Sequence, residues 1–255
     1  INKLGQWPWT RETFAKIFSK LDLIHPKAVG LDVMLSESSS RGLKDDLILR
    51  EALDRVSYPV VFPVEVDDLQ ITEGKANRAG SVLKPLAIFT DAKNVHLAHV
   101  NLIQDFDSVV RTFPLVIGGF KQFSSEVLRL SGKEINLSGF ETNPHIVYSG
   151  PTGSIRRVPV LRLFENNVDL NIFKDKLVLL GATSPDLHDD RLTPFSRGTA
   201  MPGIEIQANI LNMLLQGYSA KAAGVGLTIL WIFGAGLIYA LIFAFTKKIL
   251  WPIWL

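Results

Sequence analysis

The sequence predicts an α/β fold with a mixed, largely parallel sheet flanked by helices, followed by a C-terminal transmembrane helix. Two apolar runs, residues 27–35 and 176–181, are rich in branched side chains, which is typical of parallel strands buried on both faces. Segments with helical periodicity lie between such runs, and this alternation predicts βαβ units. Near the end, residues 222–246 are twenty-five residues without a formal charge. At ~1.5 Å per helical residue, this stretch can cross a hydrocarbon layer about 30 Å thick.

The first quarter of the chain predicts a helix, a strand, a second helix and a second strand. In the first helix, over residues 10–23, apolar side chains recur at i, i+3, i+4 and i+7, namely Phe14, Ile17, Phe18 and Leu21. The strand over 27–35 is followed by a helix over 43–56 and a strand over 58–66. Strand, helix and strand in so short a length make one βαβ unit, so we expect the two strands to be parallel.

The middle of the chain is less regular. Residues 67–93 carry charges, glycines and a proline with little periodicity, and we expect an irregular excursion there. Residues 96–102 and 109–116 are predicted strands joined by the turn-forming stretch QDFDS, most simply as an antiparallel pair. The other predicted elements are a helix over 120–130, a short strand over 146–149, a short helix or extended segment over 158–164, and the strand over 176–181.

A last amphipathic helix is predicted over residues 203–215, with its end at Gly217. Its apolar face consists of Ile204, Ala208, Leu211 and Leu215. Because it ends only a few residues before the predicted transmembrane helix, we expect it to be the mechanical link between the domain and the membrane.

Two lysines set the predicted membrane topology. Lys247 and Lys248 directly follow the apolar stretch, and short basic connections belong on the cytoplasmic side. We therefore expect residues 1–221 to form an extracytoplasmic domain on the periplasmic or extracellular side of the cell inner (cytoplasmic) membrane. Residues 222–246 are the transmembrane helix, and residues 247–255 are a short cytoplasmic turn with the start of a second membrane segment. The chain is expected to be a piece of a longer protein.

Composition narrows the function classes. The formal net charge is +2 and the basic residues are scattered, so we expect no nucleic-acid partner. Cysteine is absent, which excludes a thiol nucleophile. The sequence also lacks a G-x-S-x-G elbow, a Walker loop, a dinucleotide fingerprint and an H-E-x-x-H helix. We therefore expect this part of the protein to be no enzyme and to need no cofactor, while metal binding stays open.

Several stretches, taken in order, resemble the second type of CHASE domain, the extracellular sensory module associated with bacterial cyclases and histidine kinases. They cover most of residues 5–216, and they are GQWPWTRETFAKIFSKL, AVGLDVMLSE, AHVNLIQDFDSVVRTFPL, IVYSGPTGSIRRVP, KLVLLGATSPDLHDDRLTPF and MPGIEIQANILNMLL. Two turns depart from the family pattern. Ser108 stands where the family usually has glycine, and residues 188–190 occupy a turn that more often carries glycine and a single aspartate. The resemblance implies a ligand-sensing domain outside the membrane, followed by membrane helices and a cytoplasmic cyclase or kinase.

One group of candidate ligand-binding residues follows the apolar strands. In open α/β sheets ligands gather outside the carboxyl ends of the parallel strands. That edge is predicted to hold Asp32 and Glu37 after one strand, and Thr183, Asp186, Asp189 and Thr193 after another. Asp32 interrupts an apolar strand, so its burial is costly unless it is paired. The alternative to ligand or metal binding is a structural aspartate satisfied by backbone amides or an arginine.

A second candidate group, Asp105, Asp107 and Arg111, lies at the predicted hairpin. The two carboxylates could hold a divalent cation, and the planar guanidinium could clamp an anionic ligand. The alternative is structural, since aspartates initiate turns and Arg111 could pair with Asp107 across this one.

Together these observations predict the extracytoplasmic sensory domain of a bacterial transmembrane receptor. It would pass a change induced by a ligand or partner to membrane helices and to a cytoplasmic output domain outside this sequence. The expected partners are the lipid bilayer, an unknown small ligand, and a membrane protein or a second copy of the chain. Two alternatives stay open: an accessory or structural subunit of a larger membrane complex, and a metal-dependent hydrolase that uses the aspartate-rich turn after Gly181.

Overall fold

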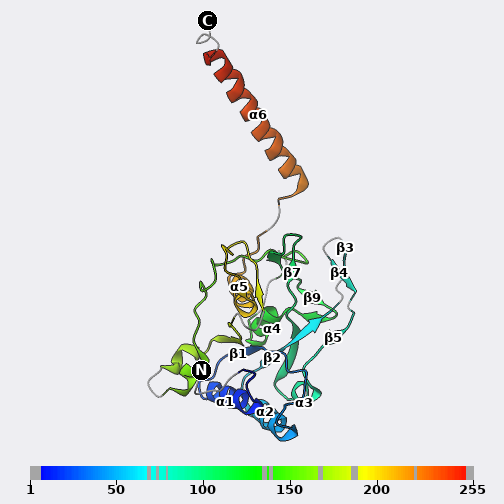
Figure 1. The fold of residues 1–255 in the computed structure, drawn as a ribbon, viewed down its shortest axis with the longest axis vertical. Helices are drawn as coiled ribbons and strands as arrows, with labels where there is room; N and C mark the ends of the chain where they lie inside the picture. Colours follow the sequence, from blue (N-terminus) through cyan, green and yellow to red (C-terminus); the bar gives the residue numbers. More distant parts are fainter. Residues whose placement is uncertain are drawn as a thin grey trace. The chain divides into compact units, whose positions relative to one another are not determined.

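The structure is a computed structural model that describes residues 7–67, 70–72, 75–78, 80–133, 137, 140–165, 169–184, 189–220 and 223–250. It divides into two compact units, a domain of Ile1–Ala220 and a C-terminal segment of Lys221–Leu255. Figure 1 shows the ribbon of both units, which are described separately below.

The main sheet of the domain is largely parallel, as predicted. Its strand order is β11 (Leu177–Gly181), β1 (Ala28–Asp32), β2 (Val60–Val66), with β6 (Val95–His99) and β5 (Val82–Leu83) both paired to β2. β1 lies parallel to β11 and to β2, and β2 lies parallel to β6. Only β5 runs antiparallel to its neighbour. The central strands are buried on both faces over most of their length, which explains their largely apolar sequences.

Helices α1 (Arg11–Asp22) and α2 (Leu43–Arg55) cover one face of this sheet (Figure 1). α1 begins where it does because the Thr10 side chain accepts a hydrogen bond from the Thr13 amide. The Asp45 carboxylate adds two more, from the amides of Arg11 and Glu12 at 3.0 and 3.1 Å, and so places negative charge at the helix N-terminus. The buried core on this face includes Phe14, Ile17, Phe18, Leu21, Val29, Leu31, Leu49, Leu53, Val60, Phe62 and Phe89.

Helices α4 (Phe123–Leu130) and α5 (Gly203–Gln216) cover the opposite face. Two glycines let them approach the strands closely. A Cβ on Gly30 would lie 2.7 Å from the Phe123 ring of α4, and a Cβ on Gly181 would lie 2.7 Å from Ile204 of α5. Both glycines therefore act as packing positions, where any larger residue would push a helix off the sheet.

Helix α5 carries three buried polar side chains that bind different parts of the domain. Gln207 accepts from the Gln122 side chain and from the Ser124 hydroxyl, and donates to the carbonyl of Val100. Asn209 accepts a hydrogen bond from the Ser149 amide at 2.8 Å, and Glu205 binds the residues around Gly153, as described below. Because each of these side chains is buried and hydrogen-bonded, α5 is fixed both to the residues around the start of α4 and to the segment after Tyr148. Of the predicted apolar face of this helix, Ile204 and Leu211 are buried, Ala208 is half-buried and Leu215 is exposed, while Ile206, Ile210, Met213 and Leu214 are also buried.

The remaining described elements are short. They are β3 (Gln70–Thr72), β4 (Lys75–Arg78), α3 (Ala87–Thr90), β7 (Ile103–Gln104), β8 (Val110–Thr112), β9 (Val116–Ile117), β10 (Phe120–Lys121), β12 (Asp190–Arg191), β13 (Met201–Pro202), and two 3-10 helices, Val160–Phe164 and Leu170–Phe173. Residues 67–93, predicted to be irregular, therefore contain a strand pair, β3 with β4, as well as β5 and α3. That prediction was wrong because such short strands carry too few residues for a periodic pattern.

The predicted pairing of residues 96–102 with 109–116 was also wrong. β6 instead lies parallel to β2, with Val60 opposite Val95. The antiparallel hairpin around the same QDFDS turn is β7 with β8, where Ile103 faces Thr112. The predicted strand over residues 146–149 is absent as well, since in this described segment only the neighbouring His145 forms isolated bridges.

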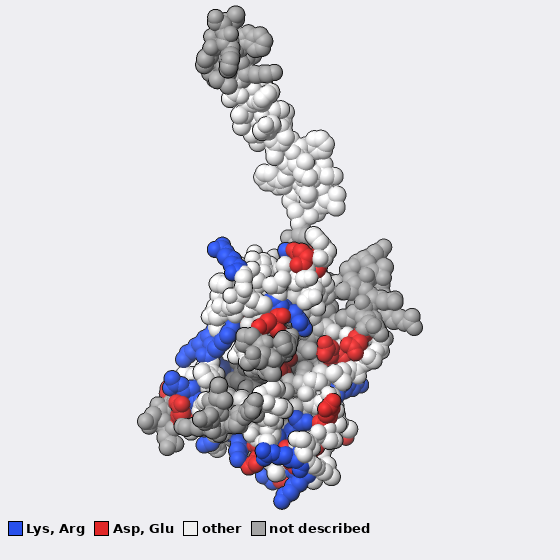
Figure 2. Space-filling view, viewed as in Figure 1, with Lys and Arg blue, Asp and Glu red and all other residues white. Residues whose placement is uncertain are grey.

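The C-terminal segment contains α6 (Val225–Leu250), whose residues 225–246 form an apolar helix with a mean hydropathy of 2.2, long enough to cross a membrane. In Figure 2 the described part of this helix is without charge, whereas acidic and basic side chains are interspersed on the visible face of the domain. By its backbone, α6 continues past Lys247 and Lys248 to Leu250. Residues 251–255 lie outside the described residues, so the second membrane segment stays a prediction.

Candidate functional site

Three carboxylates lie near one another at the carboxyl edge of the parallel sheet. Asp32 is the last residue of β1, and it lies opposite Gly181, the last residue of β11. Leu31 belongs to the core under α1 and α2, so the alternation of a strand places the Asp32 side chain on the α4 and α5 face. Burial, followed by the charges of Asp189 and Glu65, raises the pKa of Asp32 to about 7. This carboxyl group is thus poised to gain or lose its proton near neutral pH.

Among the described residues, none forms a hydrogen bond or an ion pair with the Asp32 side chain. The structural alternative from the sequence, in which backbone amides or an arginine satisfy this aspartate, is therefore not seen in the described part of the chain. A half-buried carboxyl without such partners is held more easily in its neutral form, which agrees with the direction of the pKa.

Asp189 meets the N-terminus of α5. Its backbone carbonyl accepts a hydrogen bond of 2.9 Å from the Gly203 amide. Its carboxylate lies against Gly203, because a Cβ on that glycine would overlap the carboxylate Oδ2. Partial burial raises the pKa of Asp189, while Arg191, at 3.7 Å from its Oδ1, acts in the opposite direction. Gly203 therefore provides the space in which this carboxylate approaches the positive end of the helix.

The other residues predicted at this edge differ in their exposure and in their hydrogen-bond partners. Glu37 is exposed, and its backbone carbonyl accepts a hydrogen bond from Arg11 at 2.6 Å. Thr183 is exposed, whereas Thr193 is buried and bonded to Ser196. Asp186 lies outside the described residues. The structure thus brings Asp32 and Asp189 into electrostatic contact and gives Glu37 and Thr193 separate surroundings.

Arg111 binds both aspartates of the second candidate group. Its Nη1 lies 2.7 Å from Asp105 Oδ2 and 2.8 Å from Asp107 Oδ1, and its Nη2 lies 2.8 Å from Asp107 Oδ2. The hydrogen bonds from Arg111 lower the pKa of Asp107 to about 2. The guanidinium is thus engaged across the turn, and an anionic ligand would have to compete with two carboxylates for it.

The turn of this hairpin has two further features. Ser108 has a φ of 62°, in the left-handed region where glycine is most readily accommodated. This conformation gives a physical reason for the glycine that the resemblance implies at this position. Phe106, at the tip, is fully exposed, with a relative accessibility of 103%. A large apolar side chain at a hairpin tip is available for contact with another molecule.

Sequence analysis missed two acidic residues. Glu65 interrupts the apolar strand β2 near its carboxyl end, just as Asp32 interrupts β1, so the same pattern could have identified it. Glu205 is 3% exposed and accepts hydrogen bonds from the amides of Gly153 and Ile155 and from the side chains of Thr152 and Arg157. These bonds, outweighing burial, lower the pKa of Glu205. No sequence pattern marks Glu205, because its partners lie about 50 residues away in the chain.

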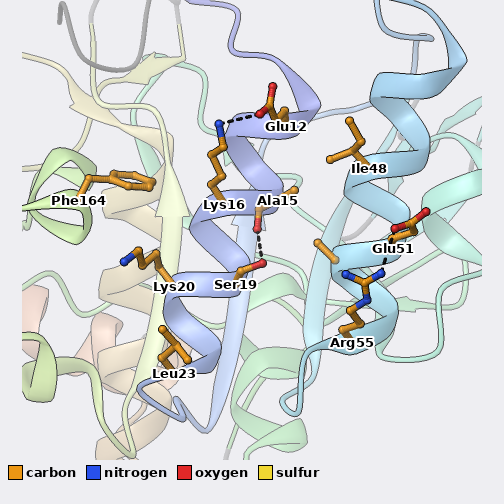
Figure 3. Close-up of a pocket in the computed structure, with 11 residues that line it drawn as sticks. Glu12, Ala15, Lys16, Ser19, Lys20, Leu23, Ile48, Glu51, Arg55 and Phe164 are labelled. Carbon is orange, nitrogen blue, oxygen red and sulfur yellow. Dashed lines mark hydrogen bonds and ion pairs between the residues drawn. The ribbon is translucent and has the colours of Figure 1, made fainter.

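A groove of about 530 Å³ lies elsewhere, between α1 and α2. Figure 3 shows its charged side chains, with Lys16 bonded to Glu12 and Arg55 bonded to Glu51. None of the candidate residues lines it. Within the described ranges, no group of three or more histidine, aspartate or glutamate side chains is placed to hold a metal ion. The metal-dependent hydrolase alternative therefore gains no support from the described part of the aspartate-rich turn.

Comparison with protein families identifies the domain. A family model described as the CHASE2 domain matches residues 1–241, which is most of the chain. The chain belongs to the CHASE2 family. Neither the curated proteins nor the solved structures contain a match to it. The predicted resemblance is therefore confirmed.

Membership in the CHASE2 family states the general role of the domain. CHASE2 domains are extracellular, sensory and non-catalytic domains of signalling receptors. The apolar residues 225–246 of α6, which could cross a membrane, are consistent with a membrane protein.

Proposed function

We propose that this CHASE2 domain is the periplasmic sensor of a bacterial receptor in the inner membrane, and that it passes a change induced by a ligand or partner to the membrane helices and a cytoplasmic output domain. The observation that carries the proposal is the direct succession of a sensory domain and a helix able to span the membrane. Only residues 221–224 lie between the end of the domain and the start of α6. So short a connection reaches roughly 14 Å at most when extended, which limits how far Ala220 can move independently of α6.

Within this function, Asp32 is suited to report a bound ligand. Its neighbours Asp189 and Glu65 are acidic and disfavour its ionised form. A ligand that brings positive charge or hydrogen-bond donors to this edge would favour ionisation instead. The hairpin residues Asp105, Asp107 and Arg111 are the second region at which we propose ligand or partner contact.

The topology can be tested by cysteine labelling, because the chain contains no cysteine. Lys44 is an exposed residue of α2, and Lys248 follows the apolar part of α6. In intact cells, a membrane-impermeant maleimide should label a Lys44→Cys variant, and it should label a Lys248→Cys variant only after the cells are permeabilised. The reverse pattern would place the domain in the cytoplasm and would refute the proposal.

A further inference from the structure

A row of backbone pairs crosses the domain from the β7–β8 hairpin to the end of the domain. Ile103 of β7 faces Thr112 of β8. Thr112 also forms an antiparallel bridge with His145, and His145 forms a second antiparallel bridge with Ala220. The hairpin and two segments that are distant from it in sequence are thus joined side by side, and the last of them ends the domain.

Further contacts hold His145 and its neighbours to the hairpin. The Ile146 amide donates to the carbonyl of Arg111 at 2.8 Å, and the Phe113 amide donates to the carbonyl of Pro144 at 3.3 Å. The Tyr148 hydroxyl donates to the carbonyl of Val110 at 2.9 Å. Segment 144–148 therefore follows any movement of β8, and β8 carries Arg111, the residue that organises the hairpin.

Helix α5 does not continue into the membrane segment. Gly217 adopts a left-handed conformation with a φ of 63°, and the Tyr218 amide bonds back to the carbonyl of Met213. These features end the helix and turn the chain away from its axis. The chain then reaches Ala220, where it is held by His145. The contact that positions the chain just before α6 is therefore a β-bridge and not the end of α5.

The row is also more easily rearranged than the main sheet. β1 and β11 are joined over five residue pairs, whereas Ala220 is joined to His145 by a single bridge. Local opening requires less free energy where few backbone pairs and little buried surface hold a segment. An element that transmits a change must have two accessible arrangements, and this row meets that requirement better than the buried sheet does.

We infer that the row Ile103, Thr112, His145 and Ala220 is the coupling element of the domain: a displacement of the β7–β8 hairpin shifts His145, and through it shifts Ala220 and the connection to α6. This inference rests on the proposed function, and it names the path by which the signal leaves the domain. It replaces the sequence-based expectation that helix 203–215 is the mechanical link.

The experiment uses the whole 255-residue chain in lipid nanodiscs. Because the chain has no cysteine, a single Ala223→Cys substitution at an exposed position carries a nitroxide spin label. Arg111→Ala perturbs the hairpin by removing its ion pairs. Arg50→Ala is the matched control, because Arg50 likewise pairs with an aspartate, Asp54, but on α2. Two further variants insert a Gly-Ser pair, either after Tyr218 or after Ala220.

Arg111→Ala should change the mobility of the label in the parent and in the variant with the insertion after Tyr218, since Ala220 can still pair with His145 there. The insertion after Ala220 should abolish this change. If Arg111→Ala lacks a cooperative unfolding transition, Asp107→Asn replaces it as the perturbation.

Three results would overturn the inference. The first is loss of the change with the insertion after Tyr218, which would assign the coupling to α5. The second is no change with the hairpin variant in the parent, and the third is an equal change with Arg50→Ala. Each leaves the maleimide result unaffected, so failure of this inference is distinguishable from failure of the proposed function.

Discussion

Replacing Asp32 by asparagine should stabilise the domain at pH 8 and leave its stability nearly unchanged at pH 4. The pKa of Asp32 is raised from an ordinary value of 3.8 to about 7 in the folded protein, first by burial and then by Asp189 and Glu65. Between these two values the folded state holds a proton that the unfolded state has lost. The free energy of unfolding therefore falls as pH rises from about 4 to about 7, and the full penalty remains above pH 7.

The size of this penalty follows from the pKa. Each tenfold change in proton affinity is worth ~1.4 kcal/mol, so a pKa of about 7 against 3.8 sets an upper limit of about 4 kcal/mol. Asp32 is only half-buried, and water reduces the effect. We expect Asp32→Asn to raise the free energy of unfolding by ~1–3 kcal/mol at pH 8, since asparagine keeps the size of the side chain and carries no charge.

The measurement is urea unfolding of the chain in nanodiscs at pH 4 and pH 8, followed by the change in tryptophan fluorescence to which Trp7 and Trp9, which pack against Phe14, contribute. Asp91→Asn, at an exposed turn residue, is the control and should show the same difference from the parent at both pH values. The reasoning is refuted if Asp32→Asn is less stable than the parent at pH 8, or if its difference from the parent does not depend on pH.

Two further substitutions test the packing of α4 and α5. Gly30→Ala should lower the free energy of unfolding by ~1–3 kcal/mol, because its Cβ would lie within 3.0 Å of Phe123 and Val127. The control is Gly224→Ala, which has open space around it and should have little effect. Equal shifts of the thermal unfolding midpoint in the two variants would contradict this explanation. Glu205→Gln should cost ~2–4 kcal/mol at pH 7, since it leaves Arg157 and the amides of Gly153 and Ile155 without their buried, charged acceptor. Because the pKa of Glu205 is lowered in the folded protein, this loss of stability should shrink as pH falls below about 4.5. The measurement is urea unfolding, with Glu165→Gln, in an exposed ion pair, as the control. A loss of stability that does not depend on pH would contradict this explanation.

The long periodic elements could be predicted from the sequence because their patterns arise locally. The helix expected over 203–215 is α5 (Gly203–Gln216), and the strand expected over 176–181 is β11 (Leu177–Gly181). In both, burial on defined faces leaves a repeating apolar pattern. The end of the helix at Gly217 was predicted because glycine readily adopts the left-handed conformation that ends helices.

The short elements could not be predicted, because their pairing depends on distant residues. β7 and β8 have two and three residues, which is too few for an alternating pattern. β6 pairs in parallel with β2, and the connection between them includes the helix α3. Because α3 has four residues, its sequence shows no periodicity from which this connection could be predicted. At the sheet edge, polar interruptions of apolar strands drew attention to Asp32. The approach of Asp189 to Gly203 arises only when α5 packs on the sheet.

The buried polar side chains of α5 restrict the kinds of motion that a signal can use. A piston movement by one helical turn is an axial shift of ~5.4 Å. It would separate Gln207 from Gln122 and Ser124 on one side, and Glu205 from the segment around Gly153 on the other. Each buried group left without its partner costs ~1–3 kcal/mol, and together these losses approach the whole stability of a domain. Sliding of α5 along its axis would therefore unfold the neighbouring segments before it could transmit a signal. Signalling motions are thus confined to the segments that few backbone pairs hold to the rest of the domain.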